Sequence, residues 1–171
     1  PFSFVDAVFD TMEASDWHVF QVLTKRSSRM RDYLRKRYQD CAPPEHIWLG
    51  VSVEDAKGAT RIEHLRSAPA AVRFLSVEPL IGPIGPVDLS GIHWVIAGGE
   101  SGPGARILNI EWARQIRDEC ARHEVSFFFK QWGGKRKKAA GRELDGETYD
   151  EMPISFVTRK SNENISSFSY A

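Results

Sequence analysis

The sequence predicts an α/β fold in which parallel β/α repeats form part of a TIM-type barrel of about five strands, followed by a polar C-terminal extension. Three observations favour this fold. Apolar strands alternate with helices along the chain, and each strand is almost continuously apolar, as a parallel sheet buried on both faces requires. Every strand also ends in polar or charged residues, whereas a doubly wound sheet concentrates its polar chemistry on one or two loops.

The first half of the chain carries three of the expected strands. Apolar residues recur at helical spacing from Phe4 to Met12, and the short apolar run HVFQVLTK follows. Ser27 and Ser28 are candidate N-caps for a basic amphipathic helix that ends near Gln39. The expected elements are a helix at 4–12, a strand at 18–25, a helix at 27–39, a strand at 46–54, a weaker helix at 55–67 and a strand at 72–80.

The second half completes the alternation. A strand is expected at 93–100, and Asn109 then caps a helix whose apolar face carries Ile116 and Cys120. A fifth strand at 125–133 closes the series. We therefore expect a partial barrel over residues 1–134 and a partly irregular extension over 135–171. Within the extension, Asp145-Gly146 is a turn signal, and the segment is read as either hairpin-like or disordered.

Composition excludes several classes of function. The 171 residues balance 23 basic against 23 acidic side chains, so no global field recruits nucleic acid or anionic lipid, and residues 130–138 form the one local basic run. Cys41 and Cys120 are too few for a disulfide framework or a metal-binding cysteine set, which favours a cytoplasmic setting. No apolar run approaches the length of a membrane span. Because the first residue is proline, the sequence is expected to be part of a longer chain.

Charged side chains gather at the predicted strand ends. Residues two apart on a strand share one face, and on every strand the polar residues share it. The charged ones are Lys25, Glu54, Glu78, Glu100 and Lys130, which we expect to meet at the mouth of the barrel. The alternative is that they are ordinary solvated strand ends. The opposite face is apolar and is expected to pack against the helices: Val22, Val51, Val53, Leu75, Val77, Val95, Phe127 and Phe129.

Histidines show the reverse pattern. His18, His46 and His93 each open a strand, at the end of the barrel opposite its mouth. His64 lies inside a helix and His123 at a helix end. We therefore expect neither histidine catalysis nor a histidine-based metal site.

The segment WVIAGGESGPGAR, residues 94–106, is a candidate anion-binding loop. Gly98 and Gly99 let the backbone pass close to a ligand, and a glycine-rich loop that leads into a helix leaves amides free. Arg106 would add a bidentate fork for phosphate or carboxylate. Glu100 would repel a bare phosphate but suit a ribose diol or an ammonium group, which favours a nucleotide or amino-acid ligand. The alternative is a purely structural turn.

Five segments together resemble a known family. They are QVLTKR (21–26), WLGVSVE (48–54), RFLSVEPL (73–80), WVIAGGESGPGAR (94–106) and FFFKQWGG (127–134). In this order they resemble the phage gene product thirty-seven/sixty-eight family, a bacterial and phage family of uncharacterised, radical-SAM-like proteins. The likeness runs from about Phe4 to Gly134 and corresponds to the C-terminal portion of the family pattern.

The resemblance implies a radical-SAM-like barrel that would be an enzyme at full length. Members carry an N-terminal cysteine cluster that ligates a [4Fe–4S] centre. This chain lacks those cysteines, so such a cluster would belong only to a longer parent. The remaining half of the pocket would hold S-adenosylmethionine or a similar nucleotide, which adds polar side chains at the middle strand ends to the candidate cofactor-binding residues: Thr24, Lys25, Ser52, Glu54, Glu78 and Glu100.

Two further expectations concern partners. The basic run at 130–138 includes Trp132, and this combination would suit a non-catalytic nucleotide- or nucleic-acid-binding module, the alternative being a solvated tail. In a five-strand piece of a barrel the apolar strand at 18–25 has an unpaired edge. We expect a second copy, a swapped segment or the C-terminal tail to cover it.

Overall fold

The computed structural model describes residues 2–136 and 140–153. The first three β/α units comprise α1 (Phe2–Glu13), β1 (Phe20–Thr24), α2 (Ser27–Arg37), β2 (Ile47–Ser52), a 3₁₀ turn (Ala56–Gly58), α3 (Thr60–Arg66) and β3 (Val72–Val77). They are followed by β4 (Trp94–Gly98), α4 (Ile110–Arg122), β5 (Ser126–Gln131), β6 (Glu143–Leu144) and β7 (Glu147–Thr148). The predicted alternation of helices and strands is confirmed.

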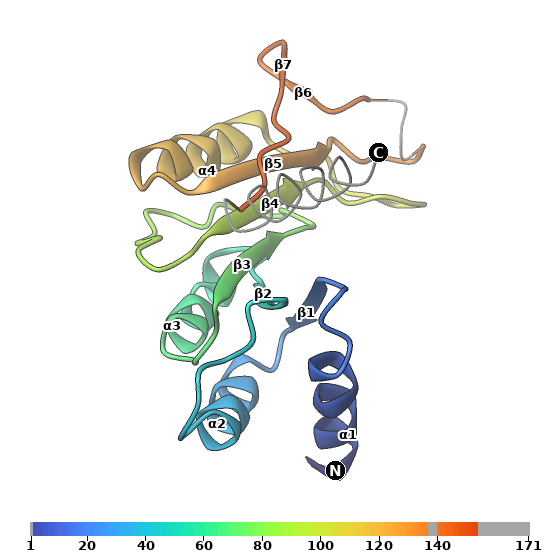
Figure 1. Cartoon of the computed structure of the whole chain (residues 1–171). Coiled ribbons are helices and arrows are strands. Elements are labelled where there is room, and N and C mark those ends of the chain that lie inside the picture. The colour runs from blue at the N-terminus through green and yellow to red at the C-terminus, as the bar shows by residue number, and fades with distance from the viewer. Residues whose placement is uncertain (1, 137–139, 154–171) are drawn as a thin grey trace, which may run out of the picture.

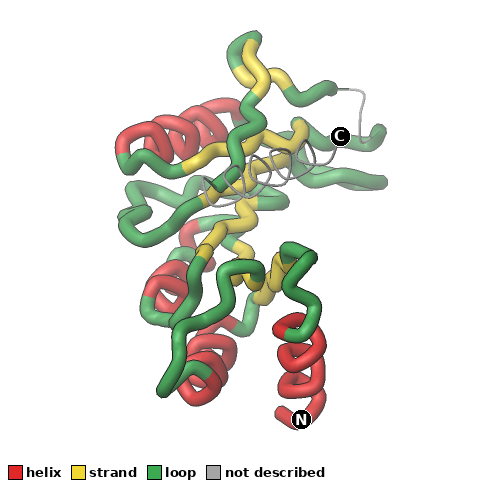
Figure 2. The backbone as a smooth tube through the Cα atoms, viewed as in Figure 1, coloured by secondary structure: helices red, strands yellow, loops and turns green. Residues whose placement is uncertain are grey.

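The five long strands form one parallel sheet in the order β1-β2-β3-β4-β5. Strand order therefore equals chain order, and each crossover leads to the neighbouring strand, as in a β/α barrel. Helices α2, α3 and α4 lie along one side of the sheet (Figure 1), and the tube in Figure 2 shows the strands running beside them. The fold is thus the predicted partial barrel, and it is not closed. None of the helices in the described part of the chain combines the length and apolarity needed to cross a bilayer.

Alternation along the strands divides the apolar residues between two faces. The helix-side face carries the main core, where Val51, Val95 and Phe129 are completely buried beside Leu34 of α2 and Leu65 of α3. All eight residues predicted to pack against helices lie in this cluster or against it. A smaller cluster on the opposite, inner face contains Trp48, Val72, Phe74 and Trp94. The predicted division of the strands into two faces is confirmed for these residues.

The predicted cap of α2 is wrong. Ser27 is the first residue of the helix, Arg26 stands at the N-cap, and no side chain caps the helix. The Ser27 hydroxyl instead hydrogen-bonds with Nδ1 of His64 in α3, at 2.9 Å, so a tertiary contact engages the oxygen that a cap would use. By contrast, Asn109 caps α4 as predicted, because its side-chain oxygen accepts a hydrogen bond from the Glu111 amide at 3.0 Å.

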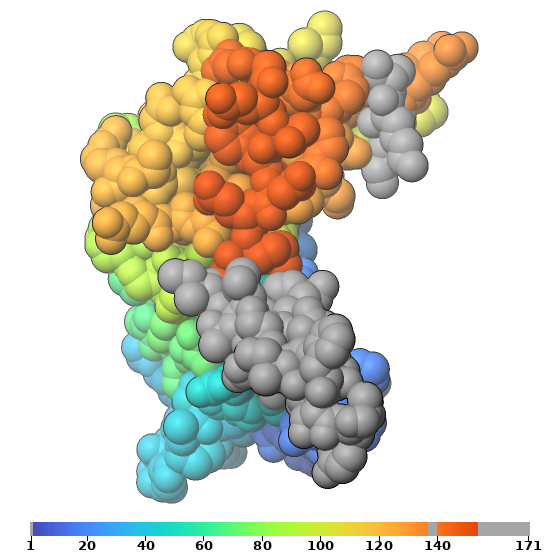
Figure 3. Space-filling model, turned by 45° about the horizontal axis from the view of Figure 1, so that its top comes forward, coloured from blue at the N-terminus to red at the C-terminus, as the bar shows by residue number. Residues whose placement is uncertain are grey.

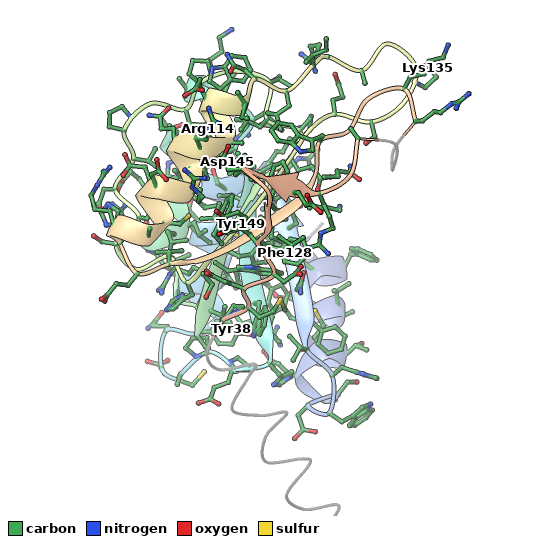
Figure 4. The ribbon with its side chains drawn as sticks, turned by 90° about the horizontal axis from the view of Figure 1, so that it is seen from above. Tyr38, Arg114, Phe128, Lys135, Asp145 and Tyr149 are labelled. Carbon is green, nitrogen blue, oxygen red and sulfur yellow. The ribbon has the colours of Figure 1, made fainter. Side chains whose placement is uncertain are left out.

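The C-terminal extension begins with a hairpin. Strands β6 and β7 pair in antiparallel fashion across Asp145 and Gly146, which have φ angles of 57° and 82°. Positive φ at both central residues identifies the tight hairpin turn that an Asp-Gly pair favours, so the hairpin alternative is confirmed. Asp145 accepts hydrogen bonds from Arg114 and Arg117 of α4. Figure 4 shows Asp145 beside Arg114, and Figure 3 shows the extension covering this end of the molecule. The rest of the predicted extension, residues 154–171, lies outside the described residues.

After the hairpin the chain returns along the outer edge of β5. The Phe129 amide donates to the Tyr149 carbonyl at 3.0 Å, and the Glu151 amide donates to the Phe127 carbonyl at 3.2 Å. An antiparallel bridge joins Phe128 to Asp150 between them. This edge of the sheet is therefore covered by the chain itself. The other edge, β1, has β2 as its one strand partner among residues 2–136 and 140–153.

The Asp145 contacts predict an acid-dependent loss of stability. Hydrogen bonds from Arg114, then from Arg117, lower the pKa of Asp145 from 3.8 to about 2. Because its folded pKa is depressed, the carboxylate stabilises the fold fully above pH 4, and this contribution is lost as the pH falls toward 2. We expect the urea midpoint to fall more over this range in the native chain than in Asp145→Asn, which cannot titrate. Parallel curves for the two chains would contradict the prediction.

Candidate functional site

A cavity of about 390 Å³ lies on the inner face of the sheet. It is lined by side chains from β1, β3, β4 and β5 and from the residue that follows β3, all with the inward parity: Gln21, Leu23, Phe74, Ser76, Glu78, Trp94, Ile96, Phe128 and Lys130. Aromatic rings form one part of the wall, and a charged pair lies at the carboxyl ends of the strands. The cavity is therefore the place where the inner face of the partial barrel meets its mouth.

The charged pair is Glu78 with Lys130. The Lys130 ammonium donates to one Glu78 oxygen at 2.9 Å, and the Gln131 side-chain amide donates to the other at 3.3 Å. These residues belong to the ends of β3 and β5, so the pair spans the intervening strand β4. Gly98 of β4 lies between the two residues: a Cβ built on it would stand 3.5 Å from Lys130 Cβ and 3.6 Å from the Glu78 carboxyl carbon, which are ordinary contact distances. Both oxygens of the Glu78 carboxylate are thus held in place.

Glu54 forms a separate cluster at the end of β2. It is buried and accepts a hydrogen bond from Arg61 of α3 at 2.8 Å, and its other oxygen pairs with Lys25. Burial raises the pKa of Glu54, but hydrogen bonds from Lys25 and Arg61 outweigh it, and the pKa is lowered overall. Arg61 also donates to the Ser52 carbonyl at 2.6 Å. The Thr24 hydroxyl accepts from the Arg26 amide at 3.0 Å, where it orders the turn after β1.

Glu100 forms a third cluster within the glycine loop. Arg106 donates to its carboxylate three times, from the backbone amide at 2.9 Å and from Nε and Nη2 at 2.8 Å each. These hydrogen bonds lower the pKa of Glu100 to about 2. The loop therefore holds an anion already, namely its own carboxylate. An external phosphate or carboxylate would have to displace Glu100 to use Arg106.

The amides of the glycine loop are directed at a neighbouring loop. The Gly99 amide donates to the Gln131 carbonyl at 2.9 Å and the Gly102 amide to the Gly134 carbonyl at 3.1 Å, while the Gly134 amide donates to the Glu100 carbonyl at 2.7 Å. Residues 99–102 and 131–134 thus continue the pairing of β4 with β5 beyond the sheet. Gly99 approaches this partner so closely that a Cβ would stand 1.9 Å from the Trp132 carbonyl oxygen.

Of the five predicted mouth charges, the structure brings two together in the cavity, Glu78 and Lys130. The other three lie at the ends of their strands in the two separate clusters, Lys25 with Glu54 and Glu100 with Arg106. All five charges have ion-pair partners. A ligand in the cavity would therefore meet a preformed pair and not a bare charge.

Sequence reasoning missed the aromatic wall and one cation. The Trp94 ring centre lies 6.0 Å from those of both Phe74 and Phe128, and all three side chains line the cavity. The sequence does indicate their position, since they lie on the same face of their strands as Ser76 and Lys130. The sequence analysis predicted site residues only among the polar side chains of that face. Arg61 lies in α3, where the alternation of side chains along a strand does not apply. Its contact with Glu54 depends on how α3 packs against β2, which the sequence does not indicate.

Neither cysteine is among the residues that line this cavity. Cys41 is exposed, and Cys120 is buried in α4, where burial raises the pKa of its thiol to about 12. Within residues 2–136 and 140–153, no group of three or more histidine, cysteine or acidic side chains could hold a metal ion.

Comparison with known proteins identifies the family of the chain. No curated protein and no solved structure matches it. A family model described as "Protein of unknown function (DUF5131)" matches residues 1–153, which is most of the chain. The match includes the whole parallel sheet, the glycine loop and the C-terminal hairpin. The chain therefore belongs to the DUF5131 family.

Proposed function

We propose that the inner-face cavity binds a nucleotide-like small molecule, with S-adenosylmethionine as the first candidate. The observation that carries the proposal is the cavity itself, in which an aromatic wall adjoins the Glu78–Lys130 pair. A flat heteroaromatic ring suits the contacts that Phe74, Trp94 and Phe128 can offer. An amino-acid group carries an ammonium and a carboxylate, and these complement Glu78 and Lys130 respectively. A ligand with both parts, such as S-adenosylmethionine, could contact the aromatic wall and the charged pair together.

Binding, and not cluster chemistry, is the activity that we assign to these residues. A [4Fe–4S] cluster needs a set of cysteine thiolates. The two cysteines of this chain do not fit that need, because Cys41 is exposed in the loop after α2 whereas Cys120 is buried in the helix-side core. The radical-SAM-like and phage assignments are proposals that rest on the sequence resemblance alone.

Lys130 provides the test. We expect Lys130→Ala to weaken S-adenosylmethionine binding roughly 10- to 100-fold in isothermal titration, because a hydrogen bond to a charged group contributes about 1.5–3 kcal/mol. The matched control is Lys135→Ala, which removes an exposed lysine at the tip of the loop after β5 (Figure 4). Absence of heat from the native chain with both S-adenosylmethionine and S-adenosylhomocysteine would defeat the proposal. Equal affinities of the two variants would defeat the role of Lys130.

A second candidate is a non-catalytic nucleic-acid-binding module. Lys135 and Arg136 favour it, because both are exposed and neither has an ion-pair partner in the described part of the chain. Trp132 is committed elsewhere, since its indole N–H donates to the Glu143 carbonyl at 2.7 Å and its ring packs against Phe129. Phosphate-dominated binding should weaken steeply between 50 and 200 mM salt. No shift of DNA or RNA at low salt would exclude this candidate.

The cellular setting and self-association through β1 are two further proposals. A reducing, cytoplasmic setting is consistent with Cys41 and Cys120, which are both free. Association through the exposed first strand is consistent with the open edge of β1.

A further inference from the structure

A second hollow, of about 420 Å³, lies between α1, the edge of β1 and the start of α2. We call it the α1–β1 groove. Six large apolar side chains are exposed in the described part of the chain, and five belong to α1, the loop after it and β1: Phe2, Phe4, Val8, Trp17 and Leu23. Phe4 is 69% exposed and Leu23 48% exposed. A concentration of this kind on one side of a molecule indicates an interaction surface.

The groove is built by ordered contacts on its far side. The Tyr33 hydroxyl of α2 donates to Asp6 of α1 at 2.8 Å, and Arg37 donates to Asp10 at 2.6 Å and to Glu13 at 2.8 Å. Phe9 and Met12 of α1 are buried in the main core. These contacts hold α1 against α2, while other residues of the helix are exposed. The exposure of Phe4 and Val8 is therefore a feature of the folded chain.

The edge of β1 offers backbone hydrogen-bonding groups. The Phe20 amide donates to the His46 carbonyl at the start of β2, and in a parallel strand the bonding direction alternates between residues. The amides and carbonyls of Gln21 and Leu23 are thus directed away from β2. Both residues are exposed, and β2 is the one strand that pairs with β1 among residues 2–136 and 140–153. An open edge of this kind is a template for a further strand.

Two cations lie at the groove. Arg26 and Arg29 line it and are exposed, and neither forms an ion pair within the described residues. The Arg29 guanidinium lies 4.9 Å from the ring centre of Phe2, which holds it over the apolar surface. Other cations near this end of the sheet, such as Lys25, already have a carboxylate partner. The groove therefore lacks a negative charge that an occupant would supply.

A second copy of the chain does not meet these requirements. A two-fold dimer would place the same surface on both sides of the interface, and the residues that line this groove include Arg26 and Arg29 but no carboxylate. A head-to-tail contact would need the free edge of β5 in the second copy. That edge is covered by Tyr149 and Glu151. The carboxylates of α1 beside the groove, Asp6 and Asp10, are already bound by Tyr33 and Arg37, which favours a partner polypeptide as the source of the complementary charge.

We propose that the α1–β1 groove docks an extended apolar segment of a partner polypeptide, with a carboxylate at one end. The segment adds to the edge of β1 through the backbone groups of Gln21 and Leu23. Its apolar side chains cover Phe4 and Leu23. Its carboxylate meets Arg26 and Arg29.

Synthetic peptides test this proposal on the full chain. One fluorescent eight-residue peptide alternates valine and threonine and ends in glutamate, its twin ends in lysine, and both carry a C-terminal amide so that the glutamate side chain is the one carboxylate. We expect the acidic peptide to bind with saturating anisotropy and at least tenfold more tightly than its twin. The exposed variant Arg29→Glu leaves one positive and one negative charge at the groove, so it should abolish this preference without disturbing the core. An acidic peptide N-methylated at alternate residues cannot form strand hydrogen bonds and should lose binding.

Several results would overturn the proposal. These are absence of saturable binding of the acidic peptide, equal affinity for the two peptides, or retained affinity for the N-methylated one. A concentration-dependent dimer that Phe4→Glu abolishes would show instead that a second copy occupies the groove. Deletion of residues 154–171 should leave the peptide affinity unchanged, and a rise of tenfold or more would identify that segment as the occupant. Leu23 lines both the groove and the inner-face cavity, but the peptide test does not require a ligand in that cavity.

Discussion

Replacing Phe129 with alanine is expected to lower the free energy of unfolding by about 3–5 kcal/mol. The side chain is completely buried in the core between the sheet and its helices. Its ring centre lies 5.0 Å from that of Trp132, which itself bonds to the C-terminal hairpin. The substitution therefore leaves a large cavity and loosens the contact that holds the hairpin to β5. Urea unfolding followed by circular dichroism measures the loss.

Phe128→Ala is the matched control for this prediction. Phe128 is the preceding residue of the same strand, but it lies half-buried on the inner face, where it lines the cavity. Its removal exposes a wall that already adjoins open space, and we expect a loss of about 1–2 kcal/mol. Equal losses for the two variants would show that the division of β5 into a core face and a cavity face is wrong. Lower ligand affinity in Phe128→Ala alone would add support for the aromatic wall.

Gly99→Ala is expected to cost about 3 kcal/mol, the upper part of the range for overpacked sites. The new Cβ would stand 1.9 Å from the Trp132 carbonyl oxygen, which is backbone and cannot rotate away as a side chain would. The two loops would have to separate and break the bond from the Gly99 amide to the Gln131 carbonyl. The same urea titration reports this loss.

The neighbouring glycine provides a control of the same chemistry. A Cβ on Gly98 would meet the Gln131 carbonyl oxygen at 3.4 Å and Lys130 Cβ at 3.5 Å, which are ordinary contacts. We expect Gly98→Ala to change stability by less than about 1 kcal/mol. If Gly98→Ala were the more damaging of the two, the close approach of the loops at residue 99 would be refuted.

The sequence predicted the sheet well because its signals are local. A parallel strand buried on both faces needs a nearly continuous apolar run, and each of the five runs became a strand. The period of two along each run then assigned Phe129 to the core and Lys130 to the cavity. The Asp145-Gly146 turn was also readable, since its backbone angles demand those residue types.

The partners of the charged residues could not be predicted from the sequence, because they depend on contacts between elements that are distant along the chain. Lys130 reaches Glu78 across β4 at a position where Gly98 has no side chain, and nothing in either strand alone indicates this. Ser27 had the residue type of a helix cap, yet His64 of another helix engages its hydroxyl. The return of the chain along β5 after the hairpin likewise has no local signature.

The order of the strands has a consequence for how the protein is made. Each strand of the sheet pairs with the strand that precedes it along the chain, so no unit has to wait for a distant sequence before it finds its neighbour. The chain segments that close between paired strands are therefore as short as a parallel sheet permits, which limits the entropy cost of forming each pair. The last segment differs, because residues 149–152 run antiparallel to β5. They hydrogen-bond to β5 and so cover the free edge of the sheet.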